Sequence, residues 1–313
     1  NIASIVYADF EQSDVGSTLD ELIRDGSISS SVLEDPARAA FADPDFRLRD
    51  WELVGVKDGG GLNGFFAIAL KNPTTGEIVF SFRGSQDLAD WTLSNFQITT
   101  SILTPAQFAV AELFVFETLN TAGPVCYNTL SDMYDAVGSS SNVSFTGHSL
   151  GGGLAQYMTY KTADFNDTDS GAASVTFNAV GIGQALDDPS LLASASYYNS
   201  VDHVNSNDVV GNYGMQLGQT VKHIDDSEID YSRVDFAILS EMIFVQIRAA
   251  VGTLDAVQAS KQLSDLKLAL NLKSPESYVH TMSVFMGYRS IGGDGFGFSN
   301  YHDLDNFLMD NPK

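Results

Sequence analysis

Ser149 is the residue whose sequence context most clearly indicates chemistry. It is the centre of Gly147-His148-Ser149-Leu150-Gly151, a Gly-x-Ser-x-Gly pattern that is weak evidence by itself in a chain with 27 glycines. An alternating apolar and polar run over 143–146 precedes it, and apolar residues at helical spacing follow it. A sharp turn between strand and helix would lift the hydroxyl clear of the backbone, and the two glycines leave room for that turn. The context therefore predicts a nucleophilic serine.

The turn Arg83-Gly84-Ser85 is a second place where residue types suit the same chemistry. It directly follows an apolar run over 78–82 that is typical of a buried strand. If that strand neighbours the one before Ser149, the backbone amides of this turn, the Ser85 hydroxyl and the Leu150 amide are candidates for an oxyanion hole. The alternative is an ordinary strand-ending turn, with Arg83 in a structural ion pair.

Asp208 is the carboxylate best placed by the pattern to orient a catalytic histidine. It follows a predicted strand over 197–204, in a segment Asn205-Ser206-Asn207-Asp208. In open sheets with parallel strands, ligands bind beyond the carboxyl ends of the strands. This position distinguishes Asp208 from the other acidic residues.

Three of the five histidines are less suited to act as the base. His148 lies inside the motif of Ser149 and is expected to point away from it as a packing residue. His203 and His223 fall on predicted strands. This leaves His280 and His302.

His280 and His302 have similar surroundings, with an apolar residue two positions on and an aromatic residue five positions on. This spacing suits a loop histidine that opens a helix. The sequence favours His280, because His302 lies near the end of the chain, where fraying would loosen the geometry that catalysis needs. Against His280, Ser274-Pro275-Glu276 resembles a helix start that would place it inside a helix.

The remaining pattern predicts one α/β domain over 1–313 with a mostly parallel sheet flanked by helices. We expect an N-terminal helical cover without chemistry of its own (1–50), a sheet core (51–225), a helical insert after the Asp208 strand (226–273) and a C-terminal segment with the catalytic histidine (274–313). Predicted helices include 105–122 and 125–137. The predicted strands are 51–56, 65–70, 78–82, 143–146, 173–181, 197–204 and 219–224.

Composition excludes several classes of protein. Forty acidic against sixteen basic residues give a formal charge of −24, which would repel nucleic acid. The single cysteine, Cys126, allows no internal disulfide. No run of 18 apolar residues is present, so we expect no transmembrane segment.

The chain resembles the class 3 lipases, an α/β-hydrolase family. The motifs are Phe80-Ser81-Phe82-Arg83-Gly84-Ser85 with Asp90-Trp91, Thr146-Gly147-His148-Ser149-Leu150-Gly151-Gly152, and Val204-Asn205-Ser206-Asn207-Asp208-Val209-Val210. The resemblance implies an α/β-hydrolase fold, Ser149 as nucleophile, Asp208 as triad acid, Ser85 and Leu150 as oxyanion-hole residues, and a mobile lid after Ser85. The apolar residues 92–104 suit such a lid, and they equally suit a segment packed on the core. The lack of a disulfide and the helical insert point to a bacterial branch.

We therefore expect a carboxylic ester hydrolase that acts on lipids at an oil–water or membrane interface and needs no metal or organic cofactor. A triacylglycerol lipase is the leading hypothesis and a phospholipase A1 the second. A catalytically silent lipid-binding module is the rival from another class, and the apolar segment near Trp91 argues against a peptidase. We also expect a monomer that is secreted.

Overall fold

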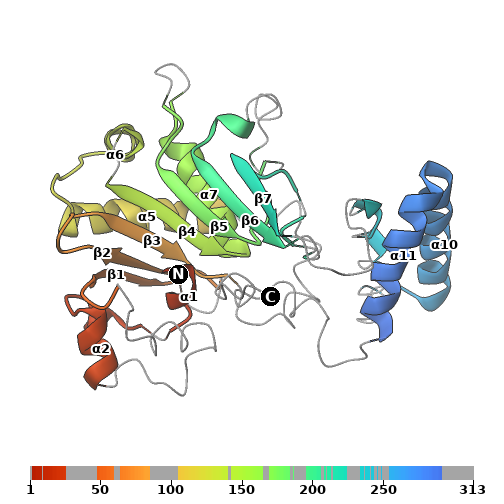
Figure 1. The fold of residues 1–313 in the computed structure, drawn as a ribbon, viewed down its shortest axis with the longest axis horizontal. Helices are drawn as coiled ribbons and strands as arrows, with labels where there is room; N and C mark the ends of the chain where they lie inside the picture. The colour runs from red at the N-terminus through yellow and green to blue at the C-terminus, as the bar shows by residue number, and fades with distance from the viewer. Residues whose placement is uncertain are drawn as a thin grey trace.

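A single sheet of seven strands forms the centre of the molecule, and its strand order in space follows the sequence (Figure 1). Strands β1 to β3 pair antiparallel, and β3 to β7 pair parallel. The mostly parallel α/β fold is therefore confirmed. The strands are β1 (Glu52–Asp58), β2 (Phe66–Lys71), β3 (Ile78–Phe82), β4 (Val143–His148), β5 (Ala173–Phe177), β6 (Ser200–Asn205) and β7 (Gln219–His223).

The structure is a computed structural model. It describes residues 2–8, 10–25, 48–59, 64–84, 105–139, 142–164, 169–183, 186, 195–205, 208, 210–212, 214–223, 233–235, 237–239, 241–242, 245, 248 and 254–290, without the side chains of 105 and 283–290.

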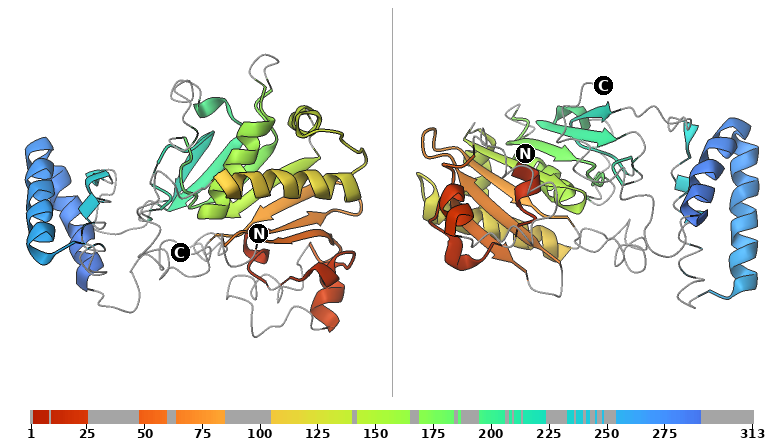
Figure 2. Two further views of the ribbon diagram at one scale, coloured as in Figure 1. Left: turned by 180° about the vertical axis from the view of Figure 1, so that it is seen from behind. Right: turned by 60° about the horizontal axis from the view of Figure 1, so that its bottom comes forward.

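Helices cover both faces of the sheet. On one face lie α5 (Pro105–Ala122), α6 (Leu130–Gly138) and α7 (Leu150–Thr162). On the other face, α1 (Ile2–Ile5) lies against β3 and β4, and α2 (Leu19–Asp25) shares a buried cluster with residues of β1 and β2. The two further views show these layers (Figure 2).

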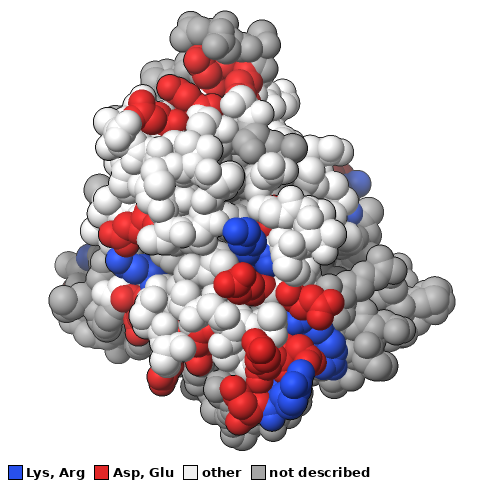
Figure 3. Space-filling model, turned by 90° about the vertical axis from the view of Figure 1, so that its left-hand side faces the viewer, with Lys and Arg blue, Asp and Glu red and all other residues white. Residues whose placement is uncertain are grey.

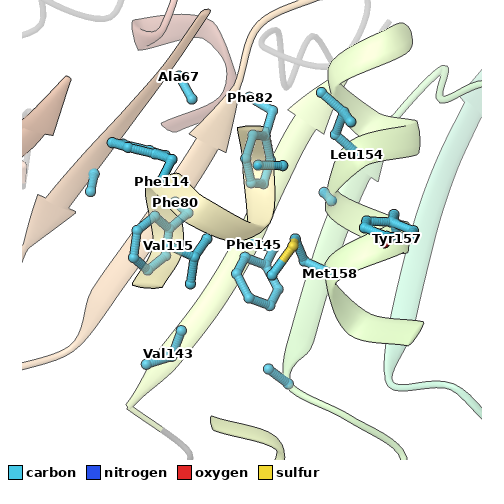
Figure 4. Close-up of a cluster of buried hydrophobic side chains, with 14 of the residues drawn as sticks. Ala67, Phe80, Phe82, Phe114, Val115, Val143, Phe145, Leu154, Tyr157 and Met158 are labelled. Carbon is cyan, nitrogen blue, oxygen red and sulfur yellow. The ribbon is translucent and has the colours of Figure 1, made fainter. Parts of the chain in front are cut away.

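Aromatic side chains fill the core between the sheet and α5 and α7 (Figure 4). Phe80 on β3 packs edge to face on Phe114 of α5, with ring centroids 5.7 Å apart and planes at 90°. Phe145 on β4 lies beside Phe80 and contributes to the same cluster. Every residue of β3 is buried. A strand buried on both faces is typical of a parallel sheet covered by two helical layers. This packing holds the carboxyl end of β3 in place.

Three element boundaries differ from the predictions by three residues or more. β5 ends at Phe177, because Asn178 takes a left-handed conformation (φ 44°) that no extended strand allows. The segment before β6 forms a 3-10 helix, η4 (Ala195–Tyr197). α6 begins at Leu130, because the Thr129 hydroxyl accepts a hydrogen bond from the Asp132 amide at 3.1 Å and the Asp132 carboxylate accepts one from the Thr129 amide.

The C-terminal helices α10 (Ala256–Lys273) and α11 (Pro275–Ser290) pack on each other and stand apart from the sheet in all three ribbon views (Figures 1 and 2). The Asp255 carboxylate caps α10 by accepting hydrogen bonds from the Val257 and Gln258 amides. The Ser274 hydroxyl accepts one from the Ser277 amide at the start of α11.

On the face shown in Figure 3, Lys and Arg side chains lie among Asp and Glu side chains and do not form a separate basic patch. Described ion pairs include Arg24 and Arg49 with Asp20. Within the described parts of the chain, no helix is both long and apolar enough for a membrane span.

Candidate active site

Ser149 occupies the sharp turn that the sequence predicts, between β4 and α7. Its backbone has φ 58° and ψ −124°, a conformation that residues other than glycine rarely adopt. The turn is held by hydrogen bonds from the Ser149 amide to the Phe177 carbonyl (3.0 Å) and from the Val180 amide to the Ser149 carbonyl (3.2 Å). A strained serine at the carboxyl end of a central parallel strand is the geometry of a nucleophile elbow.

Gly147, two residues before Ser149, allows the chain to turn so tightly. A Cβ atom on Gly147 would lie 2.3 Å from the carbonyl carbon of Gly151. No side chain can be accommodated at that distance. The sequence-based explanation of this glycine is therefore confirmed.

The turn after β3 lies directly beside Ser149. A Cβ atom on Gly84 would lie 3.1 Å from the Ser149 Cβ and 2.8 Å from the His148 carbonyl oxygen. The next residue, Ser85, lies outside the described residues. Leu150 begins α7, so its amide has no acceptor within the helix.

Arg83, in the same turn, extends over an aromatic ring. Its guanidinium carbon lies 4.1 Å from the ring centroid of Phe66 on β2, a cation–π contact, and its amide donates to the Phe66 carbonyl. These contacts give Arg83 a structural role in holding the turn.

Asp208 is buried just beyond the carboxyl end of β6, with 1% of its surface exposed. Its Oδ1 accepts hydrogen bonds from the Val210 amide (2.5 Å) and the Gly211 amide (3.0 Å). One strand separates β4 from β6, so their ends are about 10 Å apart. An imidazole with a hydrogen bond on each nitrogen spans about 8 Å, which suits this gap.

Two further buried residues, neither of which is predicted from the sequence, support β6, the strand that leads to Asp208. Asn178 accepts a hydrogen bond on Oδ1 from the Asn205 amide at 2.8 Å, and so joins the end of β5 to that of β6. Asp202 on β6 is fully buried, and its Oδ1 accepts from the Thr176 hydroxyl at 2.7 Å.

The second oxygen of Asp202, Oδ2, is buried without a hydrogen-bond partner among the described residues. Burial, with a smaller contribution from the carboxylate of Asp208, raises the pKa of this carboxyl to about 7, although hydrogen bonds from Thr176 and Ala179 act in the opposite direction. The Asp202 carboxyl is therefore neutral over much of the acidic range.

The structure places four of the five histidines. His148 is buried, with its Nδ1 3.0 Å from the Tyr7 hydroxyl oxygen. His203 on β6 and His223 on β7 are hydrogen-bonded to each other, Nδ1 to Nε2 at 2.9 Å, and burial lowers the pKa of His203, with a smaller effect of His223 in the same direction. The fifth, His302, lies outside the described residues.

His280 lies inside α11 and not in the loop that the sequence analysis favoured, because the helix begins at Pro275. Since α11 stands apart from the sheet (Figures 1 and 2), the structure does not bring His280 to Ser149. The expected lid, 92–104, also lies outside the described residues. Among the residues that the structure does describe, no group of three or more His, Cys, Asp or Glu side chains is arranged to hold a metal ion.

Residues 79–217 match the model of the family described as lipase (class 3). This segment is that of a class 3 lipase. It includes Ser149, Asp208 and the turn after β3, and the protein is accordingly a serine ester hydrolase. The N-terminal helices, the strands β1, β2 and β7, and the helices α10 and α11 lie outside the matched segment. No comparison supports the bacterial branch that the sequence suggested.

Several solved structures with a similar fold are fungal proteins. A mutant form of MDLA from Penicillium cyclopium is 11% identical, with a TM-score of 0.44, over 73% of this chain and 77% of the other. A deletion mutant of the Rhizomucor miehei lipase propeptide complex is 16% identical, with a TM-score of 0.39, over 70% and 69%. Nonglycosylated LIP2 lipase of Yarrowia lipolytica is 14% identical, with a TM-score of 0.39, over 72% and 77%. No curated protein matches the chain.

Proposed function

We propose that this class 3 lipase hydrolyses lipid esters through an acyl-enzyme on Ser149, with Asp208 as the acid of a Ser-His-Asp triad. The observation that carries the proposal is the position of Ser149. It lies on a strained turn between β4 and α7 and against the end of β3. Asp208 is buried just after β6, and only β5 lies between that strand and β4, which suits an imidazole placed between Ser149 and Asp208.

We propose His302 as the base, by elimination. His148 is directed to Tyr7, and His203 and His223 are paired with each other. His280 is on a helix that stands apart from the sheet. His302 is the remaining histidine, and its sequence context suits a loop histidine that opens a helix.

In the first half of the reaction, the imidazole takes the proton of the Ser149 hydroxyl while its oxygen bonds to the ester carbonyl carbon. Asp208 fixes the tautomer of the imidazole and stabilises the imidazolium. The oxyanion is held by the Leu150 amide and by a donor from Ser85, which follows Gly84 at the wall of the elbow. The imidazolium then protonates the departing alkoxide. In the second half, a water molecule activated by the same imidazole releases the acid.

We propose a triacylglycerol as the substrate, acted on at a lipid–water interface. Support comes from the family description, which names a lipase, and from the apolar composition of 92–104, which suits a cover over an apolar cleft.

Assays of wild-type enzyme, His302→Ala and His280→Ala on tributyrin and on phosphatidylcholine test both the base and the substrate. We expect hydrolysis of tributyrin by the wild type and by His280→Ala, and its loss in His302→Ala. Loss of tributyrin hydrolysis in His280→Ala but not in His302→Ala would identify His280 on α11 as the base. Preference for phosphatidylcholine would instead indicate a phospholipase A1, and a wild type inactive on both would indicate a lipid-binding module.

A further inference from the structure

Tyr7 lies close to the elbow although it is distant from it in the sequence. It follows α1 and is 7% exposed, in a cluster with Ile5, Phe66 and Ile68. The Ser81 hydroxyl donates to the carbonyl of Ile2 at 3.2 Å, which attaches α1 to β3. The Tyr7 ring is thus held by its surroundings and can place its hydroxyl accurately.

The Tyr7 hydroxyl bridges two backbone segments. It accepts a hydrogen bond from the Gly84 amide at 3.2 Å and lies 3.0 Å from Nδ1 of His148. A hydroxyl can accept one hydrogen bond and donate another at the same time. Donation to Nδ1 would keep the His148 proton on Nε2. The rings meet edge to face, with centroids 6.1 Å apart.

Each partner of Tyr7 directly precedes a residue of the proposed mechanism. His148 precedes the nucleophile Ser149, and Gly84 precedes Ser85. The parallel pairing of β3 with β4 ends at the Phe82–Gly147 pair. Beyond that pair, the Tyr7 hydroxyl connects the two segments through Gly84 and His148.

The space around this bridge is closed. A Cβ atom on Gly84 would lie 2.9 Å from the Tyr7 hydroxyl oxygen and 3.1 Å from the Ser149 Cβ. A shift of the β3 turn would therefore change the distance between the oxyanion donor and the nucleophile. Catalysis depends on such distances to within fractions of an ångström.

We propose that Tyr7 is a positioning residue: its hydroxyl holds the residue before the oxyanion donor against the residue before the nucleophile. The proposal rests on the proposed catalytic role of Ser149. It gives the N-terminal segment, expected to be only a cover, a part in the chemistry, and it gives His148 a function beyond packing.

The test compares Tyr7→Phe with Tyr134→Phe in the full chain. Both remove a partly or fully buried hydroxyl and keep the ring; the Tyr134 hydroxyl donates to Glu112 at 2.5 Å on the opposite side of the sheet. For Tyr7→Phe we expect kcat on a soluble p-nitrophenyl ester, and the rate of fluorophosphonate labelling, to fall about 10- to 100-fold with little change in KM. Tyr134→Phe should keep wild-type kcat at a comparable melting temperature.

His148 offers a second test that does not depend on the folding of Tyr7→Phe. His148→Asn places an acceptor near the position of Nδ1, whereas His148→Leu does not, so His148→Leu should lose more kcat than His148→Asn. Unchanged kcat in Tyr7→Phe, or equal kcat in the two His148 variants, would overturn the positioning role while leaving the proposed function in place. A wild-type protein that fluorophosphonate does not label at Ser149 would overturn both.

Discussion

A Cβ atom on Gly151 would lie 2.0 Å from the carbonyl oxygen of Phe82. The first turn of α7 therefore rests on the main chain at the end of β3, and the two segments that form the proposed oxyanion hole touch through backbone atoms. No space for a side chain remains between them.

Alanine substitutions in the first turn of α7 should show which glycine is packed against main-chain atoms and which against a side chain. Gly151→Ala meets main-chain atoms and should lower the melting temperature strongly, whereas Gly152→Ala meets the Cβ of Ala179 at 2.5 Å. We therefore expect Ala179→Gly to restore part of the stability of Gly152→Ala and none of that of Gly151→Ala. Thermal unfolding measures this. A wild-type melting temperature for Gly151→Ala would contradict the contact.

Asp208→Asn should inactivate the enzyme without unfolding it. An asparagine Oδ1 can still accept from the Val210 and Gly211 amides, but the neutral amide cannot stabilise an imidazolium. By analogy with other triads we expect kcat to fall on the order of 10⁴-fold. Asp208→Ala should lose stability as well, because both amides lose their acceptor.

The matched control is Asp202→Asn, which removes the neighbouring buried carboxyl of β6. It should retain most of its activity at pH 6, where the Asp202 carboxyl is already largely neutral. Full turnover in Asp208→Asn would direct the search to a different acid.

Asp202 should make stability depend on pH. Its pKa is about 7 in the folded protein and 3.8 ordinarily, so between these values the folded state holds a proton that the unfolded state has lost. The stability contributed by this proton is fully present below pH 4 and is lost as the pH rises through 7. Relative to that of wild type, the free energy of unfolding of Asp202→Asn should increase by on the order of 4 kcal/mol between pH 4 and pH 8.

Urea denaturation of both proteins across this range measures the difference. Subtraction cancels the titration of other groups, including His203, whose lowered pKa gives the opposite slope below its ordinary value. A difference that does not vary with pH would contradict the buried, neutral state of Asp202.

Much of the fold could be predicted from the sequence. Apolar runs bounded by glycine, proline and asparagine identified all seven strands, and the strand–turn–helix pattern placed Ser149 correctly. Local signals also set the limits of these predictions. Asn178 ends β5 through its own φ of 44°, and Pro275 begins a helix that encloses His280.

The contacts of Tyr7 could not be predicted in the same way. Its partners Gly84 and His148 lie 77 and 141 residues away in the sequence, and no spacing rule connects them. The buried state of Asp202 depends likewise on strands β5 and β7 beside it. Such features follow from the packing of the whole sheet and not from any local pattern.

The central claim is that Ser149 is the nucleophile, and labelling with a fluorophosphonate followed by peptide mass spectrometry tests it most directly. We predict one adduct, on the peptide that contains Ser149, absent from Ser149→Ala, whose turnover falls on the order of a million-fold. An adduct on another residue, or ester hydrolysis at the wild-type rate by Ser149→Ala, would contradict the account.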